Sequence, residues 1–173
     1  MPADVSGGRV CLVPLDRRHV GRTRDWANDP ALMKLMDRAA VVGAEEHDRW
    51  FASLGGRDDC AYFAIETPDA AHVGNVWLWA IDRRHLKAEL RIVIGEQDAR
   101  GRGIGSAAID ALCRYGFDQL GLHRIYAYVL ATNASARHAF GRAGFMLEGT
   151  LRDDRRAGEL FVDVVLLARV TDS

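Results

Sequence analysis

Arg100-Gly101-Arg102-Gly103-Ile104-Gly105-Ser106 is the stretch that decides the fold of this 173-residue chain. An apolar segment at residues 88–94 precedes it and predicts a β-strand, and an amphipathic segment from residue 104 to about residue 119 predicts an α-helix. Glycines allow the backbone to approach phosphate oxygens, and the unpaired amides at a helix N-terminus attract negative charge. A strand, a glycine-rich turn and a helix in this order therefore predict a cradle for a phosphate-bearing ligand.

The rest of the chain alternates between strand-like and helix-like segments, and no repeat, low-complexity block or linker divides it. We therefore expect one α/β domain over residues 1–173, in which helices cover a mixed sheet. The expected strands lie at residues 9–14, 62–66, 72–80, 88–94, 124–129, 145–151 and 160–169. The expected helices lie at residues 16–28, 31–36, 44–54, 104–119 and 133–142.

The composition is that of an ordinary globular protein, with 49% hydrophobic and 27% charged residues. The net charge of -1 provides no basic field, so we expect neither a nucleic-acid partner nor a membrane partner. Cys11, Cys60 and Cys113 form no Cys-x-x-Cys pair. Because no secretory or membrane-spanning segment is found either, we expect a cytoplasmic protein with reduced thiols. The six histidines form no metal-binding motif, and we expect no metal.

Several interpretations of the glycine-rich turn compete. A P-loop would require Gly-x-x-x-x-Gly-Lys-Ser/Thr, and this chain has no such lysine. A dinucleotide-binding turn would require Gly-x-Gly-x-x-Gly, but the third glycine position holds Ser106 and no carboxylate follows the next strand. A tight turn without a ligand is a further alternative. The remaining pattern, Arg/Gln-x-x-Gly-x-Gly/Ala, fits at Arg100, Gly103 and Gly105.

At this pattern the chain resembles the GNAT superfamily of N-acetyltransferases, in which the loop binds the pyrophosphate of acetyl-CoA. The resemblance covers nearly the whole chain and is strongest to the branch of ribosomal-protein and spermidine acetyltransferases. Beyond the loop it rests on Trp26-Ala27-Asn28-Asp29-Pro30, Ala88-Glu89-Leu90, Asn133, Ala136, Phe140, Gly144-Phe145, Glu148-Gly149 and Asp163. It implies a single GNAT-type domain with a mixed, mostly antiparallel sheet of six to seven strands and about four flanking helices. It also implies direct acetyl transfer from acetyl-CoA to a primary amine in a ternary complex.

The same resemblance implies which residues bind the coenzyme. The loop at residues 100–106 would bind the pyrophosphate through its amides, and its two arginines would add positive charge. Ile92, Val93 and Ile94 would pair with the pantetheine arm, and their amides would stabilise the oxyanion that forms on the thioester. Asn133 could contact the coenzyme, cap the helix that follows it, or do both. Phe140 would pack against the pantetheine or the core.

Attack by an amine requires a general base, because an alkyl amine is mostly protonated at neutral pH. Glu89 is the first candidate, since it interrupts an otherwise apolar strand next to the expected thioester site. The alternative is an outward-facing carboxylate opposite Arg91 or Arg124. Many GNAT enzymes have a tyrosine at the position of Phe140 that protonates the leaving thiolate, which phenylalanine cannot do. The thiolate would then take its proton from water, from the ammonium product, or from Ser135 or Tyr126.

Acceptor specificity is expected in segments that lack the coenzyme motif. These segments are residues 26–30 at the end of the first helix, the loop at residues 37–43, and the turn at residues 82–85. The candidate contacts are Trp26, Asn28 and His85. The four tryptophans could form a pocket wall or simply pack in the core. Asp37, Glu45 and Glu46 could attract a cationic amine or complement a helix N-terminus.

The sequence leaves the acceptor open among a polyamine, a protein N-terminus, an amino sugar and an aminoglycoside. The rival function is a non-catalytic acyl-CoA-binding regulatory module on the same fold, which the missing tyrosine favours. A structural assembly protein is a more distant alternative. A homodimer would be compatible with every one of these functions.

Overall fold

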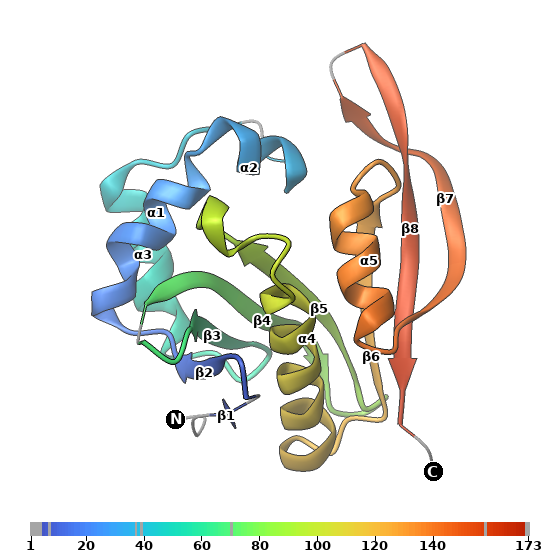
Figure 1. The fold of residues 1–173 in the computed structure, drawn as a ribbon, viewed down its shortest axis with the longest axis horizontal. Helices are drawn as coiled ribbons and strands as arrows, with labels where there is room; N and C mark the ends of the chain where they lie inside the picture. Colours follow the sequence, from blue (N-terminus) through green and yellow to red (C-terminus); the bar gives the residue numbers. More distant parts are fainter. Residues whose placement is uncertain are drawn as a thin grey trace.

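The computed structural model describes residues 5–6, 8–36, 38, 40–69, 71–157 and 159–171. The strands in this part of the chain form one sheet in the order β1-β2-β3-β4-β5-β6-β8-β7 (Figure 1). All neighbours pair antiparallel except β5 and β6, which are parallel. The strands are β1 (Val5–Ser6), β2 (Cys11–Pro14), β3 (Ala61–Glu66), β4 (His72–Asp82), β5 (Lys87–Ile94), β6 (Arg124–Leu130), β7 (Met146–Ala157) and β8 (Leu160–Val170).

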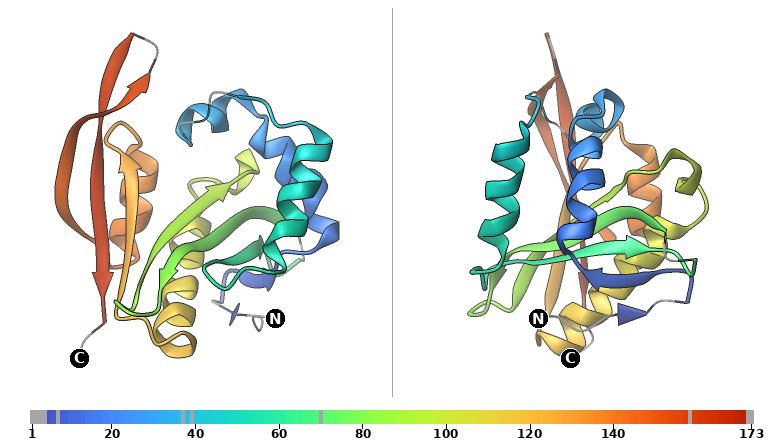
Figure 2. Two further views of the ribbon diagram at one scale, coloured as in Figure 1. Left: turned by 180° about the vertical axis from the view of Figure 1, so that it is seen from behind. Right: turned by 90° about the vertical axis from the view of Figure 1, so that its left-hand side faces the viewer.

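Helices cover both faces of this sheet (Figures 1 and 2). One face carries α4 and α5, and the other carries α1 and α3. The α4 helix is apolar on the side that contacts β2, β4 and β5, where Ile109 and Leu112 are fully buried. The helices are α1 (Val20–Ala27), α2 (Pro30–Leu35), α3 (Ala44–Leu54), α4 (Ile104–Arg114) and α5 (Ala134–Arg142).

The parallel pair β5–β6 is short and then opens into a fork. Paired residues run only from Lys87–Glu89 on β5 to Arg124–Tyr126 on β6, after which the two strands diverge. On its other side, β5 stays paired with β4 as far as Ile94. The second half of β5 therefore has one edge whose backbone groups no described strand uses.

Side chains of β5 alternate between the two faces of the sheet. Leu90 belongs to the core beneath α4, and Ile92 and Ile94 pack against that core. By this alternation, Glu89, Arg91 and Val93 lie on the face that carries α1 and α3. Two distinct surfaces thus meet along one strand.

Most predicted elements are confirmed, with differences at their ends. The sheet has eight strands instead of the predicted six to seven, because the two-residue β1 was not foreseen. Five α-helices are present in the described residues instead of about four. The helix expected at residues 16–28 begins as a 3-10 turn, Arg17–His19, before α1. The helix expected to reach residue 119 changes after Arg114 into a π-helical turn, Tyr115–Gln119.

The expected end of the strand at residue 151 was wrong, because β7 continues to Ala157. Asp153 has a φ of +52°, and the register with β8 shifts between Leu151 and Arg155. A bulge therefore allows β7 to continue alongside β8 through a charged segment. The alternation of apolar and polar residues alone predicted that the strand would end before it.

A close contact links the end of β5 to α1. A Cβ built on Gly95 would lie 2.0 Å from Cδ2 of Trp26, so the indole lies directly on the glycine backbone. The Trp26 ring also packs on His72, with centroids 4.6 Å apart, and its Nε1 donates to Glu96 Oε1 at 3.2 Å. Glycine at this position is therefore required for close packing rather than for an unusual φ angle.

We predict that Gly95→Ala lowers the free energy of unfolding by about 1–3 kcal/mol, because the added methyl group would overlap the Trp26 ring. Gly21→Ala is the matched control, since nothing lies within 4 Å of a Cβ at Gly21 in α1. The control is expected to be neutral or to stabilise by up to ~1 kcal/mol through helix propensity. Urea denaturation measures both effects, and equal effects of the two substitutions would contradict the contact.

Candidate active site

The glycine-rich turn presents a continuous row of unused amides at the start of α4. Among the described residues, the main-chain N–H groups of residues 101–106 donate to no acceptor, and Ala107 is the first to bond back, to Gly103. Gly101 and Gly103 have φ angles of +72° and +79°, in the left-handed region that favours glycine. Six consecutive donors at the N-terminus of an eleven-residue helix make a site for an anion.

The two arginines of the turn lie differently. The main-chain amide of Arg100 donates to Gln97, and its guanidinium donates to the carbonyls of Ile94 at 3.0 Å and Gly95 at 2.9 Å. Arg100 therefore fastens the turn to the end of β5. Arg102 is exposed, and its carbonyl accepts from Arg9.

A cleft of about 220 Å³ runs from this turn along the open edge of β5 toward α5. It brings together the predicted strand residues, the glycines of the turn and residues of α5. Its lining includes Ile92, Val93, Ile94, Arg100, Gly101, Gly103, Gly105, Ser106, Asn133, Ser135 and Phe140. The predicted Arg102 and Ile104 do not line this cleft, and Ile104 is buried in the core.

Asn133 and Phe140 occupy the α5 side of the cleft. The side chain of Asn133 accepts from the Ala136 amide at 3.1 Å, so it caps α5 while facing the cleft. Phe140 is 3% exposed and meets Phe145 edge-on, with centroids 4.9 Å apart. Of the alternative proton donors, Ser135 lines the cleft, whereas Tyr126 lines none of the three cavities described.

Glu89 faces a second cavity, of about 530 Å³, which lies between the diverging strands β5 and β6. Its side chain is 12% exposed, and Arg91 binds it with two hydrogen bonds, Nε–Oε1 at 2.7 Å and Nη2–Oε2 at 3.1 Å. Arg124 instead pairs with Glu148. The carboxylate is therefore a partly enclosed ion-pair partner at the edge of the cavity.

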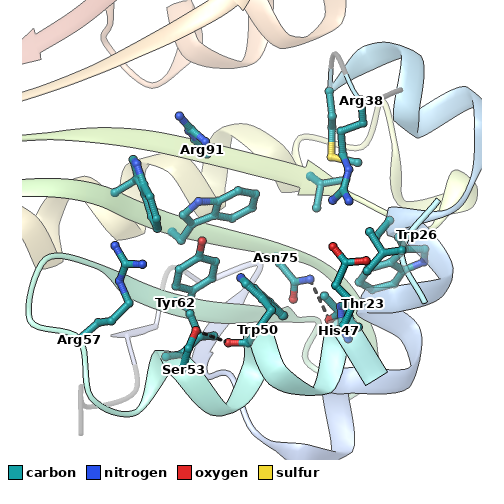
Figure 3. Close-up of a pocket in the computed structure, with 18 residues that line it drawn as sticks. Thr23, Trp26, Arg38, His47, Trp50, Ser53, Arg57, Tyr62, Asn75 and Arg91 are labelled. Carbon is teal, nitrogen blue, oxygen red and sulfur yellow. Dashed lines mark hydrogen bonds between the residues drawn. The ribbon is translucent and has the colours of Figure 1, made fainter. Parts of the chain in front are cut away.

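A third cavity, of about 340 Å³, lies on the face that carries α1 and α3 (Figure 3). Val93 lines both this cavity and the cleft beside the glycine-rich turn, and Arg91 and Trp77 line both this cavity and the one at Glu89. The three spaces therefore meet around the second half of β5. The residues that line the third cavity include Trp26, Trp50, Trp77, Trp79, Tyr62, Arg38, Arg57, Arg91, Glu46 and His47.

Aromatic rings form much of the wall of this third cavity. Tyr62 stacks on Trp77 at 5.2 Å and meets Trp50 edge-on at 5.6 Å. Burial raises the pKa of Tyr62 to about 12, so its hydroxyl keeps its proton at neutral pH. The indole N–H of Trp77 and Nδ1 of His47 have no partner among the described residues.

The predicted acceptor contacts are only partly brought together. Trp26 lines the third cavity, although it is 7% exposed and packed on Gly95. Asn28 uses its side chain on the backbone of Val42, donating at 3.0 Å and accepting at 2.8 Å. His85 lies in the exposed turn before β5, where its Nδ1 is 2.7 Å from Asp82. Neither Asn28 nor His85 lines any of the three cavities.

Several cavity residues were not foreseen from the sequence. Arg57 and Tyr62 belong to separate segments, and nothing in their local pattern relates them. Arg38, by contrast, falls within residues 37–43, where acceptor specificity was expected. Trp77 and Trp79 alternate along β4, which is compatible with either a core or a pocket. Glu46 and the four tryptophans had been considered, whereas Asp37 lies outside the described residues.

Comparison with known proteins identifies this architecture. A model of the Acetyltransferase (GNAT) domain family matches residues 9–146. The chain belongs to the GNAT acetyltransferase family. This membership confirms the predicted fold class and activity class, an N-acetyltransferase that uses acetyl-CoA.

Individual GNAT relatives differ in the acceptor that their names give. The Escherichia coli (strain K12) spermidine N(1)-acetyltransferase is 34% identical over 150 residues, covering 84% of this chain and 77% of that protein. The human alpha/beta-tubulin-N-acetyltransferase 9 is 25% identical over 179 residues, covering 96% of this chain and 83% of that protein. The fold also matches a spermidine N-acetyltransferase from Vibrio cholerae in complex with CoA and spermine. That structure has a TM-score of 0.88 and 23% identity, covering 94% of this chain and 95% of that one.

Two kinds of feature are absent from the residues of this GNAT chain that the structure describes. No group of three or more His, Cys, Asp or Glu side chains gathers where it could hold a metal ion. No helix in this part is both long enough and apolar enough to cross a membrane.

Two buried histidines lie beside the cavities on the α1 and α3 face. Burial, followed by the charge of Arg24, lowers the pKa of His47. Burial is also the largest cause that lowers the pKa of His72, whose Nε2 lies 2.9 Å from Asn75 Oδ1. Both side chains are therefore held in the neutral form in the folded chain.

We predict that stability falls when the pH drops below about 6.5, the value of an unfolded histidine. Below that pH the unfolded chain binds protons at these histidines, whereas buried His47 and His72 resist protonation in the folded chain. The free energy of unfolding therefore decreases as the pH falls, and the stabilising contribution of the two histidines is fully present only above that pH. His72→Gln should flatten this slope in urea denaturation at about pH 7.5 and about pH 5.5. His123→Gln, at an exposed position, should leave the slope unchanged. An identical slope in both variants would exclude His72 as a cause.

Proposed function

We propose that this protein moves the acetyl group of acetyl-CoA to a primary amine by direct attack in a ternary complex. The observation that carries the proposal is the row of six unused amides beside the open edge of β5. Val93 on that strand borders both the cleft and the aromatic cavity. Two ligands that enter from opposite faces of the sheet can therefore meet at one strand without a covalent enzyme intermediate.

The residues of the cleft fit the coenzyme. A diphosphate needs several donors in a concave backbone, and the amides of residues 101–106 supply them without a side chain in the way. The unpaired edge at Ile92, Val93 and Ile94 offers backbone donors and acceptors with which the amides of a pantetheine arm could pair. Asn133 and Phe140 would border that arm from α5. When bound, the coenzyme supplies an activated acyl group as a thioester.

The chain's own contribution to the reaction is electrostatic and positional. Amides on the open β5 edge would stabilise the negative charge that develops on the acyl oxygen. Glu89 would accept the proton of the ammonium acceptor, directly or through water, with Arg91 holding the carboxylate in place. Phe140 cannot donate a proton, so the leaving thiolate would be protonated by water, by the ammonium product or by Ser135.

The names of the relatives support only a broad class of acceptor, an amine. Spermidine and tubulin are the acceptors that the relatives' names contain, which supports an amine without choosing its size. A polyamine, a protein N-terminus, an amino sugar and an aminoglycoside are all compatible with the reaction. Residue 140 is a phenylalanine where many GNAT enzymes have a tyrosine, and this favours a second candidate function. That candidate is a non-catalytic acyl-CoA-binding regulator on the same fold. Release of CoA that depends on an added amine distinguishes the enzyme from the regulator.

The remaining parts of the proposal concern the whole protein. We propose that residues 1–173 act as one domain, since the sheet draws strands from both halves of the chain. We also propose a homo-oligomer, supported by exposed Met146 and Leu160 on the outer hairpin and by a dodecameric spermidine acetyltransferase from Vibrio cholerae among the neighbours. A cytoplasmic location follows from the acetyl donor, which is a metabolite of the cell interior.

Gly103→Val tests the cradle. The branched side chain would block the anion site, and we expect the dissociation constant of CoA to rise at least about tenfold, or ~1.4 kcal/mol, by titration calorimetry. Gly121→Val is the matched control, because Gly121 also has a positive φ, +65°, and lies outside the cleft. Both variants should lose a similar ~1–2 kcal/mol of stability, and only Gly103→Val should lose affinity. Full affinity in Gly103→Val would refute the cradle.

Glu89→Gln tests the base. The amide cannot accept the proton, so kcat should fall by about 10² or more and the acidic limb of the pH profile of kcat/KM should flatten. Arg91→Gln is the matched variant, since it removes the ion pair but keeps the carboxylate, and its acidic limb should persist. Stopped assays of CoA release across pH measure both. An unchanged limb in Glu89→Gln would remove this residue from the proton path.

A further inference from the structure

The aromatic cavity contains more cationic than anionic groups at its lining (Figure 3). Arg38, Arg57 and Arg91 enter it from the loop after α2, the connection after α3, and β5 respectively. Among the described residues that line it, Glu46 is the one carboxylate. A pocket for a polyamine would need the opposite balance, because each ammonium of that ligand requires a carboxylate or a free aromatic face.

The guanidinium groups retain donors for a ligand. Arg57 binds Asp59 through Nε at 2.8 Å and Nη2 at 2.6 Å, and Arg91 binds Glu89 through the same two atoms. In both arginines Nη1 has no acceptor within the described parts of the chain. The side chain of Arg38 has no ion-pair partner there at all, although its main chain donates to Met33. Arg57 and Arg91 are thus fixed by carboxylates, Arg38 is exposed and unpaired within the described residues, and all three keep unused N–H groups.

The aromatic faces that could bind an ammonium are partly occupied by these cations. The Arg57 guanidinium lies 4.4 Å from the centroid of the Trp79 ring, and that of Arg91 lies 5.7 Å from it. Tyr62 and Trp77 cover each other by stacking. The rings thus orient the guanidiniums and offer an apolar wall, rather than forming an open cage for a second cation.

We propose that the acceptor is an amine that also carries an anionic group, a carboxylate or a phosphate, together with an apolar or aromatic body. The anion would bind the guanidinium of Arg38, which has no ion-pair partner among the described residues, and the free Nη1 atoms of Arg57 and Arg91 would add positive charge to the same cavity. The ammonium would be attracted by Glu46, and the body would lie along the Trp50 and Trp77 wall. This assignment rests on the proposed acetyl transfer and names the acceptor class for the same site. It differs from the polyamine that the spermidine acetyltransferases' names give.

Matched amines that differ only in the anion test this assignment. Initial rates of CoA release at saturating acetyl-CoA are compared for tryptophan and tryptamine, phenylalanine and phenethylamine, glucosamine 6-phosphate and glucosamine, and for spermidine. In at least one pair, the amine that carries the anionic group should have a kcat/KM about tenfold higher than the amine that lacks it, and higher than that of spermidine. The preference should shrink as salt is added, since the cations are partly exposed. The amino-acid pairs and the sugar pair distinguish a carboxylate from a phosphate.

Arg38→Gln should reduce that preference about fivefold or more without lowering the affinity for CoA. Arg49→Gln is the matched control, because Arg49 is exposed on α3, lies outside the cavity lining and makes the same change in net charge. Quenching of tryptophan fluorescence by the N-acetylated acid reports binding without turnover. Release of CoA that is fastest with spermidine, or equal within each pair, would overturn the anionic acceptor alone. Failure of every amine to release CoA would instead overturn the acetyl transfer on which it rests.

Discussion

The divergence of β5 from β6 is the constraint on which the rest of the structure depends. After three paired residues the strands separate, and the backbone of β5 loses one of its two neighbours. An exposed strand edge with unpaired donors and acceptors is costly in a folded protein unless water or a ligand satisfies it. Here the edge opens between α4 and α5, directly beside the amides of the glycine-rich turn. A ligand with both a diphosphate and peptide-like amides satisfies both features together.

Rigidity on either side of the fork keeps this edge in place. Arg100 ties the turn to the carbonyls of Ile94 and Gly95, and Trp26 packs on Gly95 from the opposite face. Asn133 caps α5 at the far side of the cleft. Residues that the sequence motif associates with coenzyme contact thus also hold the scaffold. In a GNAT protein with phenylalanine in place of the usual tyrosine, positioning and main-chain electrostatics carry more of the proposed catalysis.

The acceptor side is built on a different principle. The proposed coenzyme cleft depends on backbone geometry, whereas the aromatic cavity depends on side chains from α1, α3, β3, β4 and β5. Two of its arginines, Arg57 and Arg91, are held by carboxylates and lie over the Trp79 ring, so their charge is oriented before a ligand arrives. Backbone sites suit a constant ligand, and side-chain sites can vary between relatives that share the coenzyme. Such a division agrees with relatives whose names give acceptors as different as spermidine and tubulin.

The sequence by itself determined the order of the elements, the glycine-rich cradle and the family, because these depend on local periodicity and on residues close together in the chain. The sequence predicted the bounds of α3 and β5 nearly to the residue, but it did not predict where β7 ends, because a bulge overrides the local pattern there. Only the tertiary structure decided that Glu89 pairs with Arg91, that His85 and Asn28 lie away from the cavities, and that Arg38, Arg57 and Arg91 line one cavity. Strand alternation cannot fix which face of a sheet a helix will cover, and contacts between residues distant in sequence arise only when the chain packs.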